Sequence, residues 1–100
     1  MQPMKFYLDT HDRRTQTFPA ALDEKQFSEF FAKYERIARE EGVVVLRLHV
    51  GLEDGRAFCF NMAPSAEHVK RLHERAGLPF ETITEVTTAT PGDLFFHPQV

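Results

Sequence analysis

Four side chains that can bind a metal ion or exchange a proton fall on segments with the composition of β-strands: Asp9, His11, His49 and Cys59. Asp9 and His11 are two positions apart, so a strand places both on the same face. Imidazole, thiol and carboxylate groups together suit nickel, zinc or copper, and do not suit calcium or magnesium, which prefer oxygen ligands. Neither a CxxC nor an HxxxH motif occurs. The metal site is therefore predicted only through a fold that brings these residues together.

The pairing of residues 43–50 with residues 56–62 decides which of these side chains meet. Both runs are rich in strand-forming residues, and the stretch between them ends at Gly55. A two-residue turn would mix polar with apolar residues on both faces of the hairpin. A three-residue loop with Gly55 in the left-handed conformation gives one apolar face, made by Leu46, Leu48, Val50, Phe58, Phe60 and Met62. We therefore expect the three-residue loop, which places His49 opposite Cys59.

Two helices are predicted between the strands. Asp23 can cap the first helix, Gln26 at its third position completes a capping box, and Gly42 ends it. Its apolar residues follow at helical spacing: Phe27, Phe30, Phe31, Tyr34, Ile37 and Ala38. The second helix begins after Ser65 and stops at Gly77. We expect each helix to bury one apolar face.

The strands complete a recognisable order along the chain. Residues 4–10 alternate between apolar and polar side chains, and residues 80–88 supply the last strand, before a Pro91-Gly92 turn and a tail over residues 94–100. The order strand, helix, strand, strand, helix, strand predicts an α+β ferredoxin-like fold, with an antiparallel four-stranded sheet and both helices on one face. We expect a single domain over residues 1–100, with the first and third strands in the centre of the sheet.

The face of the sheet away from the helices is expected to carry the chemistry. The predicted registers place on it Lys5, Tyr7, Asp9, His11, Val43, Val45, Arg47, His49, Ala57, Cys59 and Asn61. The strand directions bring the four candidate ligands to one edge of this face, where they form the predicted metal site. Because Tyr7, Val43 and Val45 are too apolar for a solvated surface, we also predict a homodimer through this face.

The composition limits the function classes. A net charge of −3 and a pI near 5.9, without a cluster of Lys or Arg, argue against a nucleic-acid partner. No apolar run reaches the length that spans a membrane, and residues 1–9 lack the pattern of a signal peptide. A single cysteine cannot form an internal disulfide. We expect a soluble cytoplasmic protein with no membrane partner.

Each candidate residue also has a plainer interpretation. Cys59 can be a small apolar residue in an interface, His49 can pair with an exposed carboxylate, and His11 can begin a loop. His68 and His73 look like a ligand pair, but five residues turn a helix by about 500° and separate them in angle. His73 lies on the inward flank of the second helix, so the sequence predicts a satisfied, partly buried histidine there.

Several segments together resemble a known family. They are Thr17-Phe18-Pro19, Arg56-Ala57-Phe58-Cys59-Phe60, Ala63-Pro64-Ser65-Ala66-Glu67, Arg75-Ala76-Gly77-Leu78-Pro79 and Thr84-Glu85-Val86, which span most of the chain. The family that they resemble is a small bacterial one known as domain of unknown function 4242 and often named nickel-binding proteins. The resemblance implies a dimeric ferredoxin-like protein that binds nickel, and it assigns no ligands. The chain differs from shorter members around residues 11–14 and in the tail at Phe96 and His97.

Two other functions stay open. Dimeric ferredoxin-like domains also serve as small enzymes of the monooxygenase or isomerase type, with a substrate held between sheet and helices or between subunits. Tyr7, Asp9, Arg47, His49 and Asn61 would then supply acid, base and anion-binding groups. The third interpretation is a non-catalytic interaction module whose open face is a dimer seam. We expect transition-metal binding, with nickel as the first metal, and leave catalysis undecided.

Overall fold

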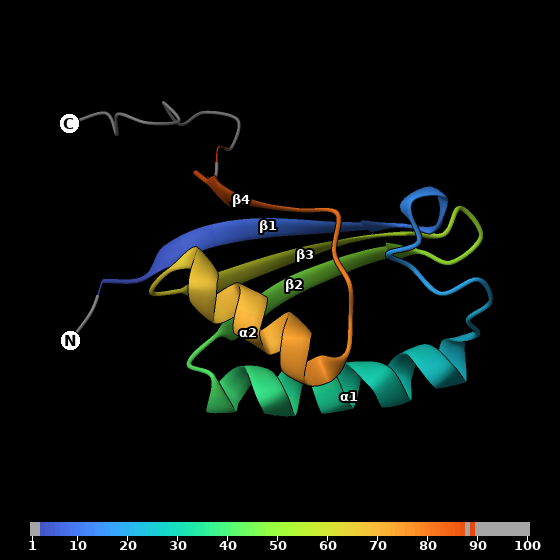
Figure 1. Cartoon of the computed structure of the whole chain (residues 1–100), viewed down its shortest axis with the longest axis horizontal. Coiled ribbons are helices and arrows are strands. Elements are labelled where there is room, and N and C mark those ends of the chain that lie inside the picture. Colours follow the sequence, from blue (N-terminus) through green and yellow to red (C-terminus); the bar gives the residue numbers. More distant parts are fainter. Residues whose placement is uncertain (1–2, 88, 90–100) are drawn as a thin grey trace.

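The computed structural model describes residues 3–87 and 89, and it has the predicted order of strands and helices. The elements are β1 (Lys5–Asp12), a short 3-10 turn (Arg13–Thr15), α1 (Glu24–Glu40), β2 (Val44–Gly51), β3 (Arg56–Ala63), α2 (Ala66–Ala76) and β4 (Thr82–Val86). The antiparallel sheet has the order β2-β3-β1-β4, so β1 and β3 are central. Figure 1 shows both helices on the same side of the sheet, which confirms the ferredoxin-like fold. Thr88, the Pro91-Gly92 turn and the tail lie outside the described residues.

The predicted helix signals act as expected. The Gln26 backbone N–H donates to Asp23 Oδ1 at 2.8 Å, and the Asp23 backbone N–H donates to Gln26 Oε1 at 3.1 Å. This capping box supplies acceptors for N–H groups that the start of α1 leaves without helical partners. Gly42 and Gly77 follow the two helices with φ angles of +77° and +71°, in the left-handed region that suits glycine. Among the described residues, no helix is both long and apolar enough to cross a bilayer.

The hairpin of β2 and β3 has a different register from the predicted one. Its loop covers residues 52–55, so four residues stand where three were expected. Further along, a bulge at residues 45–47 shifts the pairing again. His49 consequently lies opposite Phe58, and the predicted pairing of His49 with Cys59 is wrong. The four-residue loop alone sets this pairing, and it puts His49 on the face opposite to Cys59. The bulge changes only the pairing of Val44 and Val45.

The faces of β1 and β3 are also the reverse of the prediction, whereas in β2 Leu48 faces the helices as predicted. The strand residues beneath the helices are Tyr7, Asp9, His11, Val43, Val45, Leu48, Ala57, Cys59, Asn61 and Ala63. Tyr7, Val43 and Val45, which were expected at a dimer interface, belong to the core or pack against it. Strand alternation predicts which residues share a face, but it does not tell which face the helices cover.

Side-chain size explains this choice of face. Ala57, Cys59 and Ala63 are small, so the helices can approach β3 closely. The bulk of the core comes mainly from the helices, through Tyr34, Ile37, Val69 and Leu72. The large apolar side chains of β3 therefore point away from the helices.

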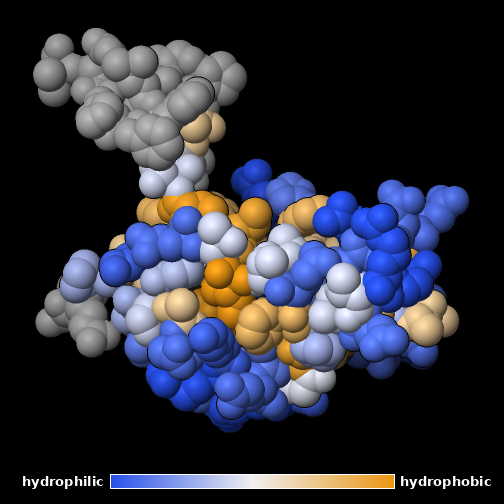
Figure 2. Space-filling model, turned by 45° about the horizontal axis from the view of Figure 1, so that its top comes forward, coloured by the Kyte–Doolittle hydropathy of each residue, from blue (hydrophilic) through white to orange (hydrophobic). Residues whose placement is uncertain are grey.

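These outward side chains form an apolar surface that we call the open-face patch. It consists of Phe6, Leu8, Val44, Leu46, Phe58, Phe60, Met62 and Val86. Phe6 stacks on Phe60 with ring centroids 5.7 Å apart, yet Phe6, Val44 and Leu46 remain 38%, 44% and 43% exposed. Figure 2 shows another side of the molecule, where a band of apolar surface runs between hydrophilic ends. The described chain thus leaves several large apolar side chains without cover.

Candidate metal centre

Asp9, His11 and His73 meet in the interior, between the sheet and α2. His11 Nε2 lies 2.7 Å from Asp9 Oδ1, and His73 Nε2 lies 3.2 Å from the same oxygen. The two imidazole rings stack with their centroids 5.3 Å apart, and none of the three residues is more than 2% exposed. The three donor atoms are close enough together to hold one metal ion.

The backbone accounts for this meeting. Asp9 and His11 share the helix-facing side of β1, which extends past the predicted end at residue 10 and so includes His11. His73 lies on the buried face of α2, together with Val69, Leu72 and Ala76. The rings of Tyr34 and Phe80 contact the His73 ring edge-on, with centroids 5.6 and 5.2 Å away. Packing on both sides therefore fixes the orientation of His73.

Both histidines are also oriented by backbone carbonyl groups. His11 Nδ1 lies 2.8 Å from the Pro79 oxygen, and His73 Nδ1 lies 2.7 Å from the Val69 oxygen. A carbonyl oxygen only accepts, so each Nδ1 carries a hydrogen and donates it. In a neutral imidazole the Nε2 atom then carries no hydrogen and can only accept a hydrogen bond or bind a metal through its lone pair. Both lone pairs are directed at Asp9 Oδ1, which is an acceptor as well.

This arrangement needs a positive charge between the nitrogen atoms and the carboxylate oxygen. A second proton on each imidazole would supply it, and so would one metal ion. A buried cluster with two imidazolium groups and one carboxylate would carry a net positive charge, which burial disfavours. In metal centres of proteins, the ligating histidine commonly donates its other N–H to a carbonyl or carboxylate group, as both histidines do here.

Positive charge beside Asp9 favours its ionised form in spite of burial. Burial alone would raise the pKa of this carboxyl group, but hydrogen bonds and positive charge from His11 and His73, where these imidazoles are protonated, outweigh burial and lower the pKa below its ordinary value. Asn61 Nδ2 donates to Asp9 Oδ2 at 2.7 Å and so holds the second oxygen. Within the described part of the chain, Tyr34 Oη and Asn61 Oδ1 are buried without a hydrogen-bond partner. Asn61 therefore holds the Asp9 carboxylate in place, and two polar atoms in the same core have no hydrogen-bond partner.

The cluster includes two of the four predicted ligands, Asp9 and His11. Cys59 pairs with Asp9 across the two central strands, and burial, followed by the charge of Asp9, raises the pKa of its thiol. His49 is exposed on the open face, opposite Phe58, with the sheet between it and the others. The expectation of ligands on the open face is wrong, because the helices cover the face that carries Asp9, His11 and Cys59.

The side chains expected to supply acid, base and anion-binding groups in an enzyme also lie on two different faces of the sheet. Tyr7, Asp9 and Asn61 are buried beneath the helices. Arg47 and His49 are exposed on the other face of the sheet, opposite Phe60 and Phe58. The sheet separates the two groups, so these five side chains do not form one site.

His73 is the residue of the centre that the sequence analysis missed. The sequence predicts a partly buried, satisfied histidine there, whereas the ring is buried and directs Nε2 at Asp9. The available signal is its place among Val69, Leu72 and Ala76, the residues with which α2 faces the sheet. A histidine among these residues indicates a polar partner on the sheet face that the helices cover. The sequence analysis assigned the wrong face to the helices and therefore missed this signal.

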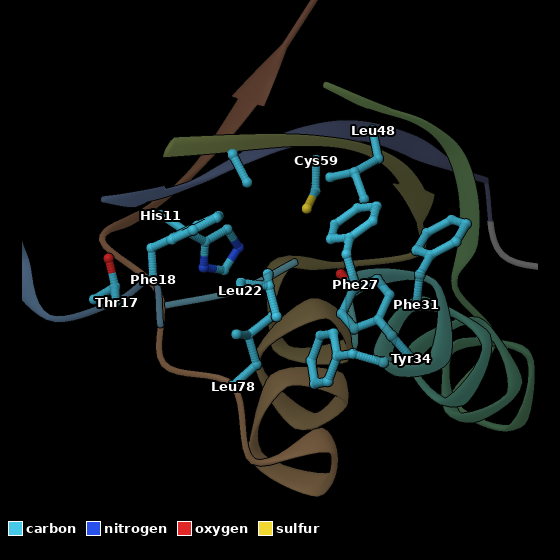
Figure 3. Close-up of a pocket in the computed structure, with 12 residues that line it drawn as sticks. His11, Thr17, Phe18, Leu22, Phe27, Phe31, Tyr34, Leu48, Cys59 and Leu78 are labelled. Carbon is cyan, nitrogen blue, oxygen red and sulfur yellow. The ribbon is translucent and has the colours of Figure 1, made fainter. Parts of the chain in front are cut away.

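An apolar pocket adjoins the centre on the side of α1. Figure 3 shows the His11 ring and the Cys59 sulfur pointing into it from the sheet, with Phe27, Phe31 and Tyr34 lining it from α1. The pocket has a volume of about 40 Å³. A group bound there would lie beside one of the candidate metal ligands.

Comparison with known proteins agrees with this architecture. The family model described as "Nickel responsive protein SCO4226-like" matches residues 7–86. The crystal structure of SCO4226 from Streptomyces coelicolor A3(2) is similar, with a TM-score of 0.71 and 25% sequence identity over 85% of this chain and 99% of that chain. No curated protein matches the chain. Since the family model covers most of the sequence, the chain belongs to the SCO4226-like family of nickel-responsive proteins.

Proposed function

We propose that this protein binds a divalent transition metal, with nickel as the first candidate, through Asp9 Oδ1, His11 Nε2 and His73 Nε2. The observation that carries the proposal is the convergence of two carbonyl-oriented imidazoles on one carboxylate oxygen. Two nitrogen donors and one oxygen donor suit nickel, copper, zinc or iron better than calcium or magnesium. The family description supports nickel among these metals.

The spacing of the donor atoms fits a single ion. Two ligand atoms that each lie about 2.1 Å from a metal and meet at a right angle are about 3.0 Å apart. The Nε2 to Oδ1 distances of 2.7 Å and 3.2 Å bracket this value.

A comparison of two histidines on α2 tests this proposal. Titration calorimetry with nickel and with zinc should be run on tag-free protein, on His73→Ala and on His68→Ala. A structural four-ligand site contributes about 10–16 kcal/mol, so one ligand is worth about 3 kcal/mol, or roughly 200-fold in affinity. We expect His73→Ala to lose this amount and His68→Ala, whose ring bonds to Ser65, to bind as the unaltered protein does.

His73→Gln keeps more of the buried volume and guards against a loss of binding caused by misfolding. Circular dichroism should show both His73 variants folded before titration. Nickel binding by folded His73→Ala and His73→Gln with the affinity of the unaltered protein would contradict the proposed centre.

We also propose that the protein is a homodimer through the open-face patch, with a second copy of the chain as the occupant. The open-face patch lies on a sheet with three strands of 8 residues and one of 5, so the face measures at most about 26 by 19 Å. Contiguous apolar patches of several hundred Å² on such a face often mark an interface. Arg47 lies near the β2 edge and Glu81 near the β4 edge, where Glu81 accepts a hydrogen bond from Thr10. A two-fold axis parallel to the strands would bring these opposite charges together.

Sedimentation equilibrium at micromolar concentration tests the dimer. Phe60→Glu and Val44→Glu place a charge in the open-face patch and should convert the dimer to a monomer. Ala32→Glu adds the same charge at an exposed position of α1 and should leave the dimer intact. A monomeric unaltered protein, or a dimer that persists in both patch variants, would contradict this assembly.

A further inference from the structure

The segment between α2 and β4 lies against the proposed centre. It covers residues 78–81, which we call the strap, and Figure 1 shows it running from the helix layer to the edge of the sheet where β4 begins. The Pro79 oxygen accepts the hydrogen bond from His11 Nδ1 at 2.8 Å. The Phe80 ring contacts the His73 ring edge-on, with centroids 5.2 Å apart. One short segment therefore contacts both histidines of the centre.

The strap is tied down mainly at its two ends. The Leu78 N–H donates to the His73 backbone oxygen at 2.9 Å, and the Glu81 N–H donates to the Thr10 backbone oxygen at 2.7 Å. Between these bonds, Pro79 has no N–H to donate. A segment with so few hydrogen bonds can open locally for a small part of the free energy of unfolding.

An ion reaches the centre only if part of the fold moves. Asp9, His11 and His73 are 0%, 2% and 1% exposed. The first two belong to β1, and the third belongs to α2. Hydrogen-bond ladders and core contacts hold both elements, so their separation would require most of the free energy of unfolding. The strap contacts the centre without belonging to either element, so it can move while both stay in place.

A surface hollow beside the strap reaches as far as His73. The hollow has a volume of about 370 Å³ and is lined by His73, by Glu74 and by residues 77–80. The exposed carboxylate of Glu74 attracts a divalent cation to this entrance. The apolar pocket on the α1 side reaches only His11 of the three donors, and its walls are mainly phenylalanine and leucine side chains. A hydrated cation would lose its water there without replacement, which is unfavourable.

We propose that the strap is the gate through which a divalent cation enters and leaves the centre. The inference rests on the proposed metal binding. The strap turns about Gly77, whose φ of +71° suits glycine, exposes both imidazoles to the hollow, and then closes over them again. Because its contacts are the same with and without the ion, a weaker strap should speed entry and release by the same factor and leave the affinity unchanged.

Leu78 offers a way to loosen the strap without altering a donor of the centre. Its side chain packs against the core and leaves it when the strap opens, so Leu78→Ala lowers the cost of opening. Stopped-flow association and chelator-induced release, measured on tag-free protein with nickel and with zinc, should both become about tenfold faster. The Kd from calorimetry should stay unchanged. Thr10→Val removes the side-chain hydrogen bond to Glu81 and should raise both rates about twofold, which guards against a folding defect in Leu78→Ala.

Leu22→Ala is the matched control. Leu22 is half-buried and lines the apolar pocket, as Leu78 does, but it lies outside the strap. Its truncation should therefore leave both rates unchanged. Hydrogen exchange adds a measurement without metal. The amides of residues 78 and 81 should exchange faster than those of β1 and β3, and faster still in Leu78→Ala.

Several results would overturn the strap proposal alone. They are unchanged rates in both strap variants, faster release without equally faster association, equal acceleration in Leu22→Ala, and strap amides as protected as those of the central strands. A failure of nickel and zinc to bind the unaltered protein at equilibrium, measured first, would overturn the proposed centre and this inference with it.

Discussion

Replacement of Asp9 by asparagine should separate the stability of the core from its capacity to bind metal. The amide has the shape of the carboxylate, so its oxygen can still accept the hydrogen bond from Asn61. Its two N–H groups can face the Nε2 atoms of His11 and His73, in place of the oxygen that both atoms now contact. Neutral imidazoles that donate through Nδ1 accept these hydrogen bonds without a second proton. The variant therefore resolves the conflict between acceptors that the native cluster contains.

The expected gain follows from the burial of the cluster. Neutral groups of similar shape in place of buried ions are commonly neutral or stabilising by about 1–4 kcal/mol. Each new neutral hydrogen bond contributes about 1 kcal/mol. For metal-free Asp9→Asn we expect the free energy of unfolding to rise by about 2 kcal/mol, which raises the Tm of a domain of this size by about 10 °C. Its nickel affinity should fall sharply, because the anionic donor is lost.

Urea denaturation followed by circular dichroism measures this difference. The assay should be run at pH 8 with a chelator, where free imidazole is neutral, and at one fixed protein concentration because association would add to stability. Glu67→Gln, which removes an exposed carboxylate from α2, controls for the change in net charge. A loss of about 3–5 kcal/mol in Asp9→Asn would refute the reasoning, because it would show that the ionised cluster is a stabilising network.

Three further outcomes test other parts of the structure. Asp12→Asn should destabilise the protein near neutral pH. Arg14, followed by Arg56, lowers the pKa of Asp12 from 3.8 to about 2. The contribution of Asp12 to the free energy of unfolding is therefore present above pH 3.8 and is lost as the pH falls through 2. Denaturation curves of both proteins should converge at low pH, and high salt should reduce the difference because these partners are exposed. Gly55→Ala should cost about 1–2 kcal/mol in denaturation experiments, since φ is +70° and a Cβ would lie 2.7 Å from the Arg13 side chain. Cys59 should react with a thiol reagent only as fast as the protein opens, because it is 4% exposed and burial raises its pKa.

The sequence was sufficient to predict the fold because its signals are local. Asp23 and Gln26 form the expected capping box, and Gly42 and Gly77 follow the helices in the expected conformation. The order of elements then restricts the topology to the ferredoxin-like arrangement. None of these signals depends on how strands pair in detail. The correct fold was accordingly available from residues that are close together in the chain.

The candidate site depended on information that the sequence does not carry locally. A four-residue loop moved His49 away from Cys59, and a bulge at residues 45–47 shifted the pairing of the rest of β2. The apolar residues on the outer face were as numerous as those inside, so periodicity alone could not identify the covered face. Asp9 and His11 were identified from residue type and spacing, whereas His73 required the packing of α2 on the sheet. Sequence reasoning therefore found the chemistry of β1 and missed its partner on the helix.

The position of the proposed centre would link metal binding to folding. His73 and Asp9 are 64 residues apart, so one ion would join α2 to β1 across most of the described chain. A ligand that binds only the folded state stabilises it by about 2.7 kcal/mol when its free concentration is 100 times the Kd. Small domains are stable by only about 5–15 kcal/mol, so this gain would be a large fraction of the total. Nickel bound at the proposed centre should consequently raise the stability of the whole domain, which thermal denaturation with and without nickel would measure.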